Sequence, residues 1–358
     1  MESTLIYPYC GEYIPMFHCC NHYAIDHVVS LRGTGYENKD AGEANLLSSQ
    51  SIFVETDFEK CLASSDTLLI TEEEKSEKVL AKAIEAMEFA GRQKKKVICA
   101  MELNDEVLAH VRSVCSDFLY LPEQACEYLD IESQGLKKIN TPVVFVGGLF
   151  GDTEEFAVLC RLTEYFRKKN FRVSGIGCST YCELLDLHTM PRFMQAGRSK
   201  TDNDRVIMFN HFLAQIEREE KPDIIFVQLP YGMMKFDDYT PNTFGIMAYI
   251  IAQSVCPDYF VCCSFYDRFP PEFWRAICTF IQGRFGFQLD CVHMTNLALF
   301  YPDILEEQKL STYRIPLSKV NEVINNNMGD GNIPVVNALT DEGLCLLVKH
   351  IENSLLQE

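Results

Sequence analysis

The sequence predicts an α/β protein of two domains, each with a parallel sheet between layers of helices. The chain has 358 residues, which favours two domains over one. Short apolar segments alternate with amphipathic segments along nearly the whole chain, and strands separated by helices form parallel sheets. A polar segment with glycine and proline, SQGLKKINTP, interrupts the alternation near residues 133–142. We therefore predict domains at residues 1–138 and 139–358.

Six short apolar segments are the predicted strands of the first domain: TLIYPY, HVVSLR, SIFVE, DTLLIT, KKVICAM and DFLYL. Helical segments lie between them, and the clearest is SEKVLAKAIEAMEFAGRQKKK. Its apolar residues recur every three or four positions, and its lysine-rich end suits a helix C-terminus. This order of elements predicts a Rossmann-like or flavodoxin-like domain.

The second domain repeats the alternation. Its predicted strands are VVFVG, FRVSGIG, PDIIFVQLP, YFVCCSF and QLDCVHMTN, and its helices are DTEEFAVLCRLTEYFRKKN, DRVIMFNHFLAQIEREEK and PEFWRAICTFIQGRFG. The tail adds a strand and helix in TYRIPLSKVNEVINNN, a strand in IPVVNAL and a helix in TDEGLCLLVKHIENSLL. These elements predict a second parallel sheet covered by helices.

Composition and charge limit the classes of partner. The net charge of −19 repels the phosphates of nucleic acid and of anionic membranes, so it favours a basic peptide or protein. No apolar run has the length of a bilayer span, and MESTLIYPYCGEY lacks the pattern of a signal peptide. We expect a cytoplasmic protein whose 16 cysteines are buried thiols, for example Cys99, Cys160 and Cys345.

The segment VGGLFGDT, residues 146–153, resembles a phosphate-binding loop with the pattern G-x-x-x-x-G-K-[ST]. Gly151 and Thr153 match this pattern, whereas Asp152 stands in place of the lysine that neutralises phosphate. A carboxylate about 4 Å from one phosphate charge costs about 1 kcal/mol in water and about 4 kcal/mol near a protein surface. We therefore expect a nucleotide with a divalent cation to be disfavoured, although a metal bridging Asp152 to phosphate would reverse this.

Residues of about 140–300 resemble the nucleotide-binding proteins that include dethiobiotin synthetase and the nitrogenase iron protein. KPDIIFVQLPYGM is similar to the strand with their second motif, and CPDYFVCCSFYD is similar to the strand that follows. The resemblance implies a P-loop-like second domain with a degenerate phosphate loop. Glu154 and Glu155 are expected to begin the next helix, where its dipole favours carboxylates.

Polar loops after predicted strands provide the candidate ligand-binding residues, because ligands bind at the carboxyl ends of parallel strands. One such loop is LRGTGYENKDAGEAN, and another is PYGMMKFDDYTPNTFG, which would face the loop at 147–153. Plain surface loops remain the alternative. The candidates are Gly33, Gly35, Lys39, Asp40, Gly147, Gly148, Gly151, Asp152, Thr153, Asp237 and Asp238.

Two segments rich in cysteine and histidine suggest a metal site or a thiol–imidazole pair. GIGCSTYCELLDLHTM lacks the third cysteine of a CxxxCxxC cluster motif, because Leu185 stands in its place. MFHCCNH needs a further ligand from another segment. Ordinary packing residues are the alternative for both. The candidate catalytic residues are Asp152, Cys182 and His188, and the candidate metal ligands are His18, Cys19, His22, Cys178 and Cys182.

Four segments in order resemble a family of clostridial peptide-maturation proteins that are encoded beside radical-SAM enzymes and short precursor peptides. The segments are LIYPYCGEYIPMFHC, NKDAG, FVGGLFGDTEEF and YCELLDLHTMPRFM. The resemblance spans most of the chain and implies a role in maturing ribosomally made, post-translationally modified peptides. It includes Asp40, Gly148, Gly151, Asp152, Glu155, Cys182, His188 and Pro191.

These features together predict an accessory protein that binds the precursor peptide or a partner maturation enzyme, such as the radical-SAM enzyme. One alternative is a nucleotide- or metal-dependent enzyme that modifies the peptide. Another is an iron–sulfur or zinc carrier. Neither nucleic acid nor a membrane is an expected partner, because the chain is strongly acidic.

Overall fold

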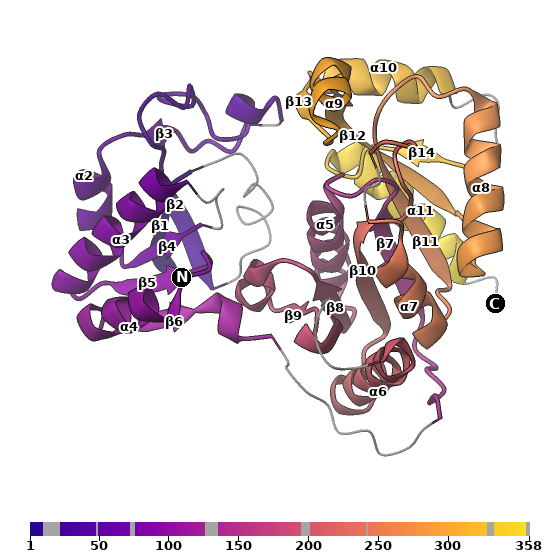
Figure 1. Cartoon of the computed structure of the whole chain (residues 1–358), viewed down its shortest axis with the longest axis horizontal. Helices are drawn as coiled ribbons and strands as arrows, with labels where there is room; N and C mark the ends of the chain where they lie inside the picture. Colours follow the sequence, from indigo (N-terminus) through magenta and orange to yellow (C-terminus); the bar gives the residue numbers. More distant parts are fainter. Residues whose placement is uncertain are drawn as a thin grey trace. The chain divides into compact units, whose positions relative to one another are not determined.

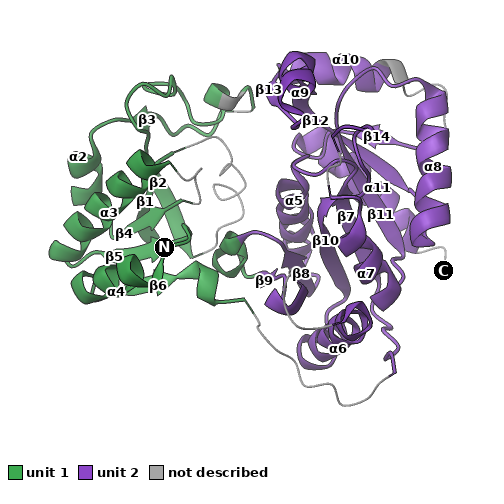
Figure 2. Ribbon diagram, viewed as in Figure 1, with its two compact units in different colours: residues 1–125, 180–186 green, residues 126–179, 187–358 purple. Residues whose placement is uncertain are grey.

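The computed structural model (Figure 1) describes residues 1–9, 22–47, 49–71, 76–125, 135–194, 201–240, 243–327 and 333–355. The chain forms two compact units, which Figure 2 shows in different colours. The first contains residues 1–125 and 180–186, and the second contains residues 126–179 and 187–358. The break at residue 125 precedes the predicted boundary at 138. A short segment from the second half of the chain therefore completes the first unit.

The first unit contains a parallel sheet, and all six strands predicted for it are confirmed. The strand order β3-β2-β1-β4-β5-β6 is that of a Rossmann sheet. The strands are β1 (Glu2–Tyr7), β2 (Tyr23–Val29), β3 (Val54–Glu55), β4 (Thr67–Ile70), β5 (Lys96–Cys99) and β6 (Phe118–Tyr120). The helices are α2 (Phe58–Ala63), α3 (Glu77–Arg92) and α4 (Asp105–Val114), with single turns η2 (Glu43–Asn45) and η3 (Leu121–Glu123).

Helix α3 shows why these segments fold as predicted. Ser76 caps its N-terminus by accepting a hydrogen bond from the Val79 N–H group. Its buried positions recur at helical spacing and are mostly small, including Ala83, Ala86 and Ala90. Small side chains allow the helix to pack closely on the sheet.

The second unit contains a larger sheet, parallel in every described pair except β12 with β13. Its order is β13-β12-β11-β7-β10-β8-β9, and β14 pairs with β12. The central strand β7 (Val143–Gly148) is buried at every position. The others are β8 (Val173–Gly177), β9 (His188–Thr189), β10 (Ile224–Gly232), β11 (Tyr259–Tyr266), β12 (Cys291–Leu299), β13 (Thr312–Arg314) and β14 (Val335–Val336).

Helices cover both faces of this sheet. Phe145 and Ile225 share a core cluster with residues of α6, α7 and α8. Phe226, the residue after Ile225, instead packs on Phe166 of α5, and successive strand residues point to opposite faces. The helices are α5 (Glu155–Lys168), α6 (Asp202–Glu220), α7 (Ile246–Ser254), α8 (Pro271–Phe285), α9 (Tyr301–Glu307), α10 (Leu317–Asn327) and α11 (Asp341–Leu355). The short 3₁₀ helices are η4 (Thr180–Leu185), which belongs to the first unit, and η5 (Arg192–Met194).

Neighbouring strands β7 and β11 lead to helices on opposite faces. The loop after β7 leads to α5, and the segment after β11 leads to α8. The Leu149 N–H group donates to the Cys263 carbonyl at 2.8 Å, so this loop begins beside β11. In open α/β sheets, ligands bind at such a switch point. The loop between β7 and α5 therefore lies where the fold favours a ligand.

Most of the described cysteines are buried. Cys99 and Cys160 are buried as predicted, whereas Cys345 is exposed on α11. Among the described residues, no helix combines the length and the apolar character that crossing a membrane requires.

Candidate functional site

The loop between β7 and α5 has an unusual backbone. Gly151, Asp152 and Glu154 have φ angles of 80°, 52° and 66°, which non-glycine residues rarely adopt. Gly151 also lies close to β10, since a Cβ there would be 2.9 Å from the Gly232 nitrogen. Strained conformations of this kind gather at ligand sites and switches. The loop therefore has an unusual backbone conformation, although Asp152 stands at the position of the lysine in the phosphate-loop pattern.

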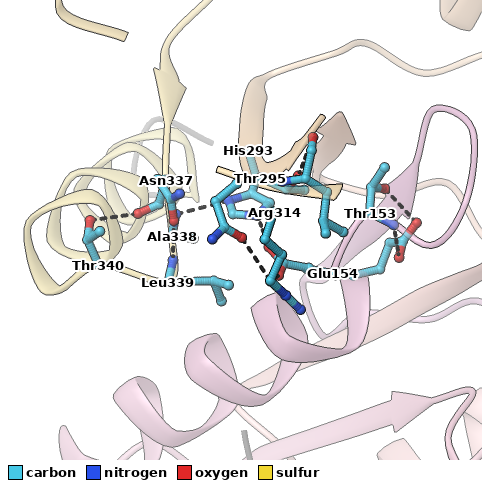
Figure 3. A network of polar contacts seen from close by, with 12 residues as sticks. Thr153, Glu154, His293, Thr295, Arg314, Asn337, Ala338, Leu339 and Thr340 are labelled. Carbon is cyan, nitrogen blue, oxygen red and sulfur yellow. Dashed lines mark hydrogen bonds and ion pairs between the residues drawn. The ribbon is translucent and has the colours of Figure 1, made fainter. Parts of the chain in front are cut away.

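The carboxyl group of Glu155 folds back into this loop. Glu155 is the first residue of α5, as predicted, but its side chain is buried, with the residue 6% exposed. Its Oε2 accepts a hydrogen bond from the Thr153 N–H group at 3.0 Å, and its Oε1 accepts one from the Thr153 hydroxyl at 2.7 Å. Figure 3 shows these two bonds at Thr153. A phosphate loop offers such N–H groups to its ligand. Here an internal carboxyl group takes one of them.

The glycine at position 148 makes room for Glu155. A Cβ at Gly148 would lie 1.7 Å from the Glu155 Oε1 and 2.6 Å from the Thr153 hydroxyl oxygen. Burial raises the pKa of Glu155 to about 7, although the hydrogen bonds from Thr153 oppose the increase. The charge of Asp152 raises this pKa further. In either protonation state, an oxygen of Glu155 remains available to accept the Thr153 N–H bond.

A second polar cluster joins this loop to β12 and β13. Arg314 donates from Nη1 to the Glu154 Oε1 at 2.7 Å and to the Asn296 Oδ1 at 2.8 Å (Figure 3). The side chains of Glu154 and Arg314 are 10% and 22% exposed. The guanidinium group at this loop therefore already has a carboxylate partner, and it does not replace the missing lysine.

His293 lies behind this ion pair and is completely buried. The Ala338 N–H group donates to its Nδ1 at 3.0 Å, so the hydrogen-bond network assigns the ring proton to Nε2. That Nε2 lies 4.0 Å from the Glu154 Oε2, and neither atom has a hydrogen-bond partner among the described residues. Burial lowers the pKa of His293 to about 3. The Nε2–H group of neutral His293 and the Glu154 carboxylate oxygen therefore face each other at a distance too long for a hydrogen bond.

Replacing Arg314 with methionine is expected to destabilise the second unit by about 3 kcal/mol, because it leaves the carboxylate of Glu154 without its charged partner. The partly exposed Arg314 reduces the loss relative to a fully buried pair. The measurement is urea unfolding followed by the fluorescence of Trp274, the only tryptophan, which lies in α8.

The matched control for Arg314 is the double variant Arg314→Met with Glu154→Gln. Glutamine removes the unpaired charge, so the double variant should recover at least half of the lost stability. Equal losses in the single and double variants would show that the ion pair does not hold the loop to β13.

The remaining candidates of the second unit have local partners. A Cβ at Gly147 would lie 2.9 Å from Leu229, so this glycine permits close packing of β7 on β10. The Asp237 Oδ1 accepts hydrogen bonds from the Tyr239 and Thr240 N–H groups at 2.8 and 2.6 Å. Asp238 pairs with Lys235 and is exposed. The two aspartates therefore organise the turn after β10.

In the first unit, Asp40 organises its own loop. It is 4% exposed, and its carboxylate accepts hydrogen bonds from the N–H groups of Gly42, Glu43 and Gln50 and from the Ser49 hydroxyl. Burial acts to raise the pKa of Asp40, but these hydrogen bonds outweigh it and the pKa is lowered. The negative charge of Asp40 is therefore stabilised by hydrogen bonds within its own loop.

Two glycines of the same loop allow backbone φ angles that other residues rarely adopt. Gly33 and Gly35 have φ angles of 88° and 81°, and apart from the adjacent residues no atom of the described chain lies within 4 Å of a Cβ built on either. The Gly33 N–H group donates to the Glu37 carboxylate at 2.5 Å. Lys39 is exposed. These residues form a tight turn with open space around it.

The candidate catalytic and metal residues are divided between the units. Cys182 is buried in η4 of the first unit, whereas Cys178 and His188 belong to the second. The His188 Nε2 lies 2.6 Å from a Glu220 carboxylate oxygen. His22 lies 3.1 Å from Asp186 within the first unit. Pro191 is buried, and His18 and Cys19 lie outside the described residues.

Sequence reasoning did not identify the polar cluster on β12 and β13. His293 and Asn296 are polar residues within the largely apolar segment CVHMTNLAL, and this is the signal that the sequence contained; both are buried in the structure. Buried polar side chains need partners, so they mark positions where the fold supplies them. Arg314 lies 160 residues from Glu154 along the chain, and only the strand order brings them together.

A separate pocket of about 390 Å³ lies between α6 and α7. Val206, Ile246 and Ile250 give it an apolar wall, and Arg284 contributes a charge. None of the residues predicted from the sequence lines this pocket.

The comparisons with known proteins show that another protein has a similar fold, and they show nothing about function. No family model matches the chain. No curated protein matches it either. Among solved structures, it is similar to the crystal structure of a DUF1611 family protein from Anabaena variabilis, determined at 2.30 Å resolution. The TM-score is 0.65 over 100% of both chains, with 10% sequence identity. The fold therefore recurs in a second protein, at an identity that shows no shared activity.

Proposed function

We propose that the protein is an accessory binding protein of peptide maturation, which binds a precursor peptide or a partner maturation enzyme and does not hydrolyse nucleotides. The observation that carries this proposal is the Glu155 carboxyl group, which accepts the Thr153 N–H bond that a phosphate would need. The peptide-maturation context rests on the sequence resemblance of four segments.

The charges around the loop support a cationic ligand. Asp152, Glu154 and Glu155 are three acidic residues within four positions, and Arg314 is the one cation paired with them in the described structure. Asp152 is exposed, so its charge is available to a partner. A lysine, an arginine or an amino terminus of a peptide complements this carboxylate, whereas a triphosphate is repelled by it.

The test is co-purification of the tagged full-length protein with a precursor peptide and a radical-SAM enzyme of the kind that the resemblance implies are encoded beside it. We expect a stable complex at low salt that weakens as ionic strength rises. The variant Asp152→Asn should reduce the amount of bound peptide, because asparagine removes the charge and tolerates the positive φ angle.

The control is Glu219→Gln, which removes an exposed carboxylate near the opposite edge of the same sheet. The neighbouring Glu217 accepts hydrogen bonds from Asn140 and Thr141, just before β7 begins, which places this end of α6 at the amino edge. This variant should bind as the wild type does. Absence of any complex, or equal losses in both variants, would contradict the proposal.

A further inference from the structure

Three side chains of different metal-binding types converge at one edge of the sheet in the first unit. They are His27 on β2, Glu55 at the end of β3 and Cys61 on α2. One ligand atom from each lies within 4.8 Å of the other two. The His27 Nδ1 and Glu55 Oε1 are 3.1 Å apart. We propose that these residues form a binding site for a divalent transition metal of the zinc class.

The ligand set suits that class of ion. Zinc accepts imidazole nitrogen, thiolate sulfur and carboxylate oxygen, and a site with three protein ligands leaves a fourth position for water or a substrate. A thiolate and a carboxylate together neutralise a dication. Tetrahedral zinc places its nitrogen and sulfur ligands about 3.5 Å apart, so the present spacing needs only small side-chain rotations.

Ser64 orients the imidazole for this role. Its hydroxyl lies 3.0 Å from the Cys61 carbonyl, which only accepts hydrogen bonds, and 3.0 Å from the His27 Nε2. In the metal-free protein the His27 Nδ1 donates to the Glu55 carboxylate, and its Nε2 accepts from the Ser64 hydroxyl. With a metal on Nδ1 the ring proton moves to Nε2, and Ser64 can accept it while the hydroxyl proton serves the Cys61 carbonyl. The Nδ1 atom then faces Glu55 and Cys61 as the coordinating nitrogen. Metal-bound histidines commonly donate their other N–H group in this way.

The site is reachable from solvent and its neighbours allow the ion to enter. β3 is the edge strand of the sheet, and the side chains of His27 and Glu55 are 26% and 32% exposed. Lys60 lies 3.7 Å from the Glu55 carboxylate, but its side chain is 74% exposed and is free to turn into solvent. Cys61 is 1% exposed and supplies the inner ligand. On binding, the metal takes the place of the thiol proton, which passes to solvent.

The experiment is a cobalt titration of the full-length protein after removal of metals under reducing conditions. We expect one Co²⁺ per chain at this site, with the absorption band of a cobalt–thiolate bond, and competition by Zn²⁺. The band should be lost in Cys61→Ala and in His27→Gln. Ser64→Ala should weaken the affinity by about 10- to 100-fold, as loss of an outer hydrogen-bond partner does.

The matched control is Cys115→Ala, another buried cysteine of the same unit. It should keep the full cobalt signal. Because Cys61→Ala removes a core side chain, a second measurement uses His27→Gln, which changes a side chain that is only partly buried. Zn²⁺ should raise the thermal stability of the wild type and leave that of His27→Gln unchanged. A wild-type protein without the cobalt–thiolate band, or a band that persists in Cys61→Ala and His27→Gln, would overturn the assignment.

Discussion

Replacing Glu155 with glutamine is expected to increase the free energy of unfolding by about 3 kcal/mol at pH 8 and to change it little near pH 4.5. Burial raises the pKa of Glu155 from 4.5 to about 7, a difference of 2.5 units, and each unit corresponds to about 1.36 kcal/mol. A folded-state pKa above the unfolded value means that the protonated group stabilises the fold. This stabilisation is complete below pH 4.5 and is lost as the pH rises through 7.

Glutamine imitates the protonated carboxyl group at every pH. Its carbonyl oxygen can accept the Thr153 N–H bond, and its amide group can donate to the Thr153 hydroxyl oxygen. The measurement is urea unfolding of both proteins between pH 4.5 and 8, followed by Trp274 fluorescence, with Glu219→Gln as the exposed control. A difference that does not depend on pH would show that Glu155 is not buried in the loop.

Replacing Gly148 with alanine is expected to destabilise the second unit by about 3 kcal/mol, at the upper end of the usual cost of overpacking. The added Cβ would lie 1.7 Å from the Glu155 Oε1, so the carboxyl group would have to leave its position. In a protein that already carries Glu155→Ala, the same change should cost less, because the closest colliding atoms are gone and only the Thr153 hydroxyl oxygen at 2.6 Å must still move.

Gly283 provides the control for this pair of variants. It lies within α8 of the same unit, and no atom lies within 4 Å of a Cβ built on it. Gly283→Ala should stabilise the unit by up to about 1 kcal/mol, as alanine does inside a helix. If Gly148→Ala costs the same with and without Glu155, the two residues do not share the loop interior.

The strands and most long helices were predictable because their hydrophobic patterns are strong. The helix α7 was missed because its sequence IMAYIIAQS is apolar on nearly every side, so no helical face is visible in it. The boundary between units was placed by composition alone. Segment 180–186 could not be assigned in this way, because its membership of the first unit depends on tertiary contacts.

The candidate site was predictable only in part. The loop position and the substitution of lysine by Asp152 are visible in the sequence. Glu155 was expected at the helix start, and it is there, but its burial depends on the space that Gly148 leaves. The His27 cluster was missed because its residues follow no short motif and meet only through the pairing of β2 with β3.

We expect the loop between β7 and α5 not to accept a nucleotide phosphate. The most direct measurement is isothermal titration calorimetry of the full-length protein with Mg-ATP and Mg-GTP, repeated with Mn²⁺. The buried Glu155 carboxyl group and the exposed Asp152 predict no saturable binding up to about 1 mM nucleotide, which corresponds to a binding free energy weaker than about 4.1 kcal/mol. Saturable binding of either nucleotide at micromolar concentrations would contradict the account.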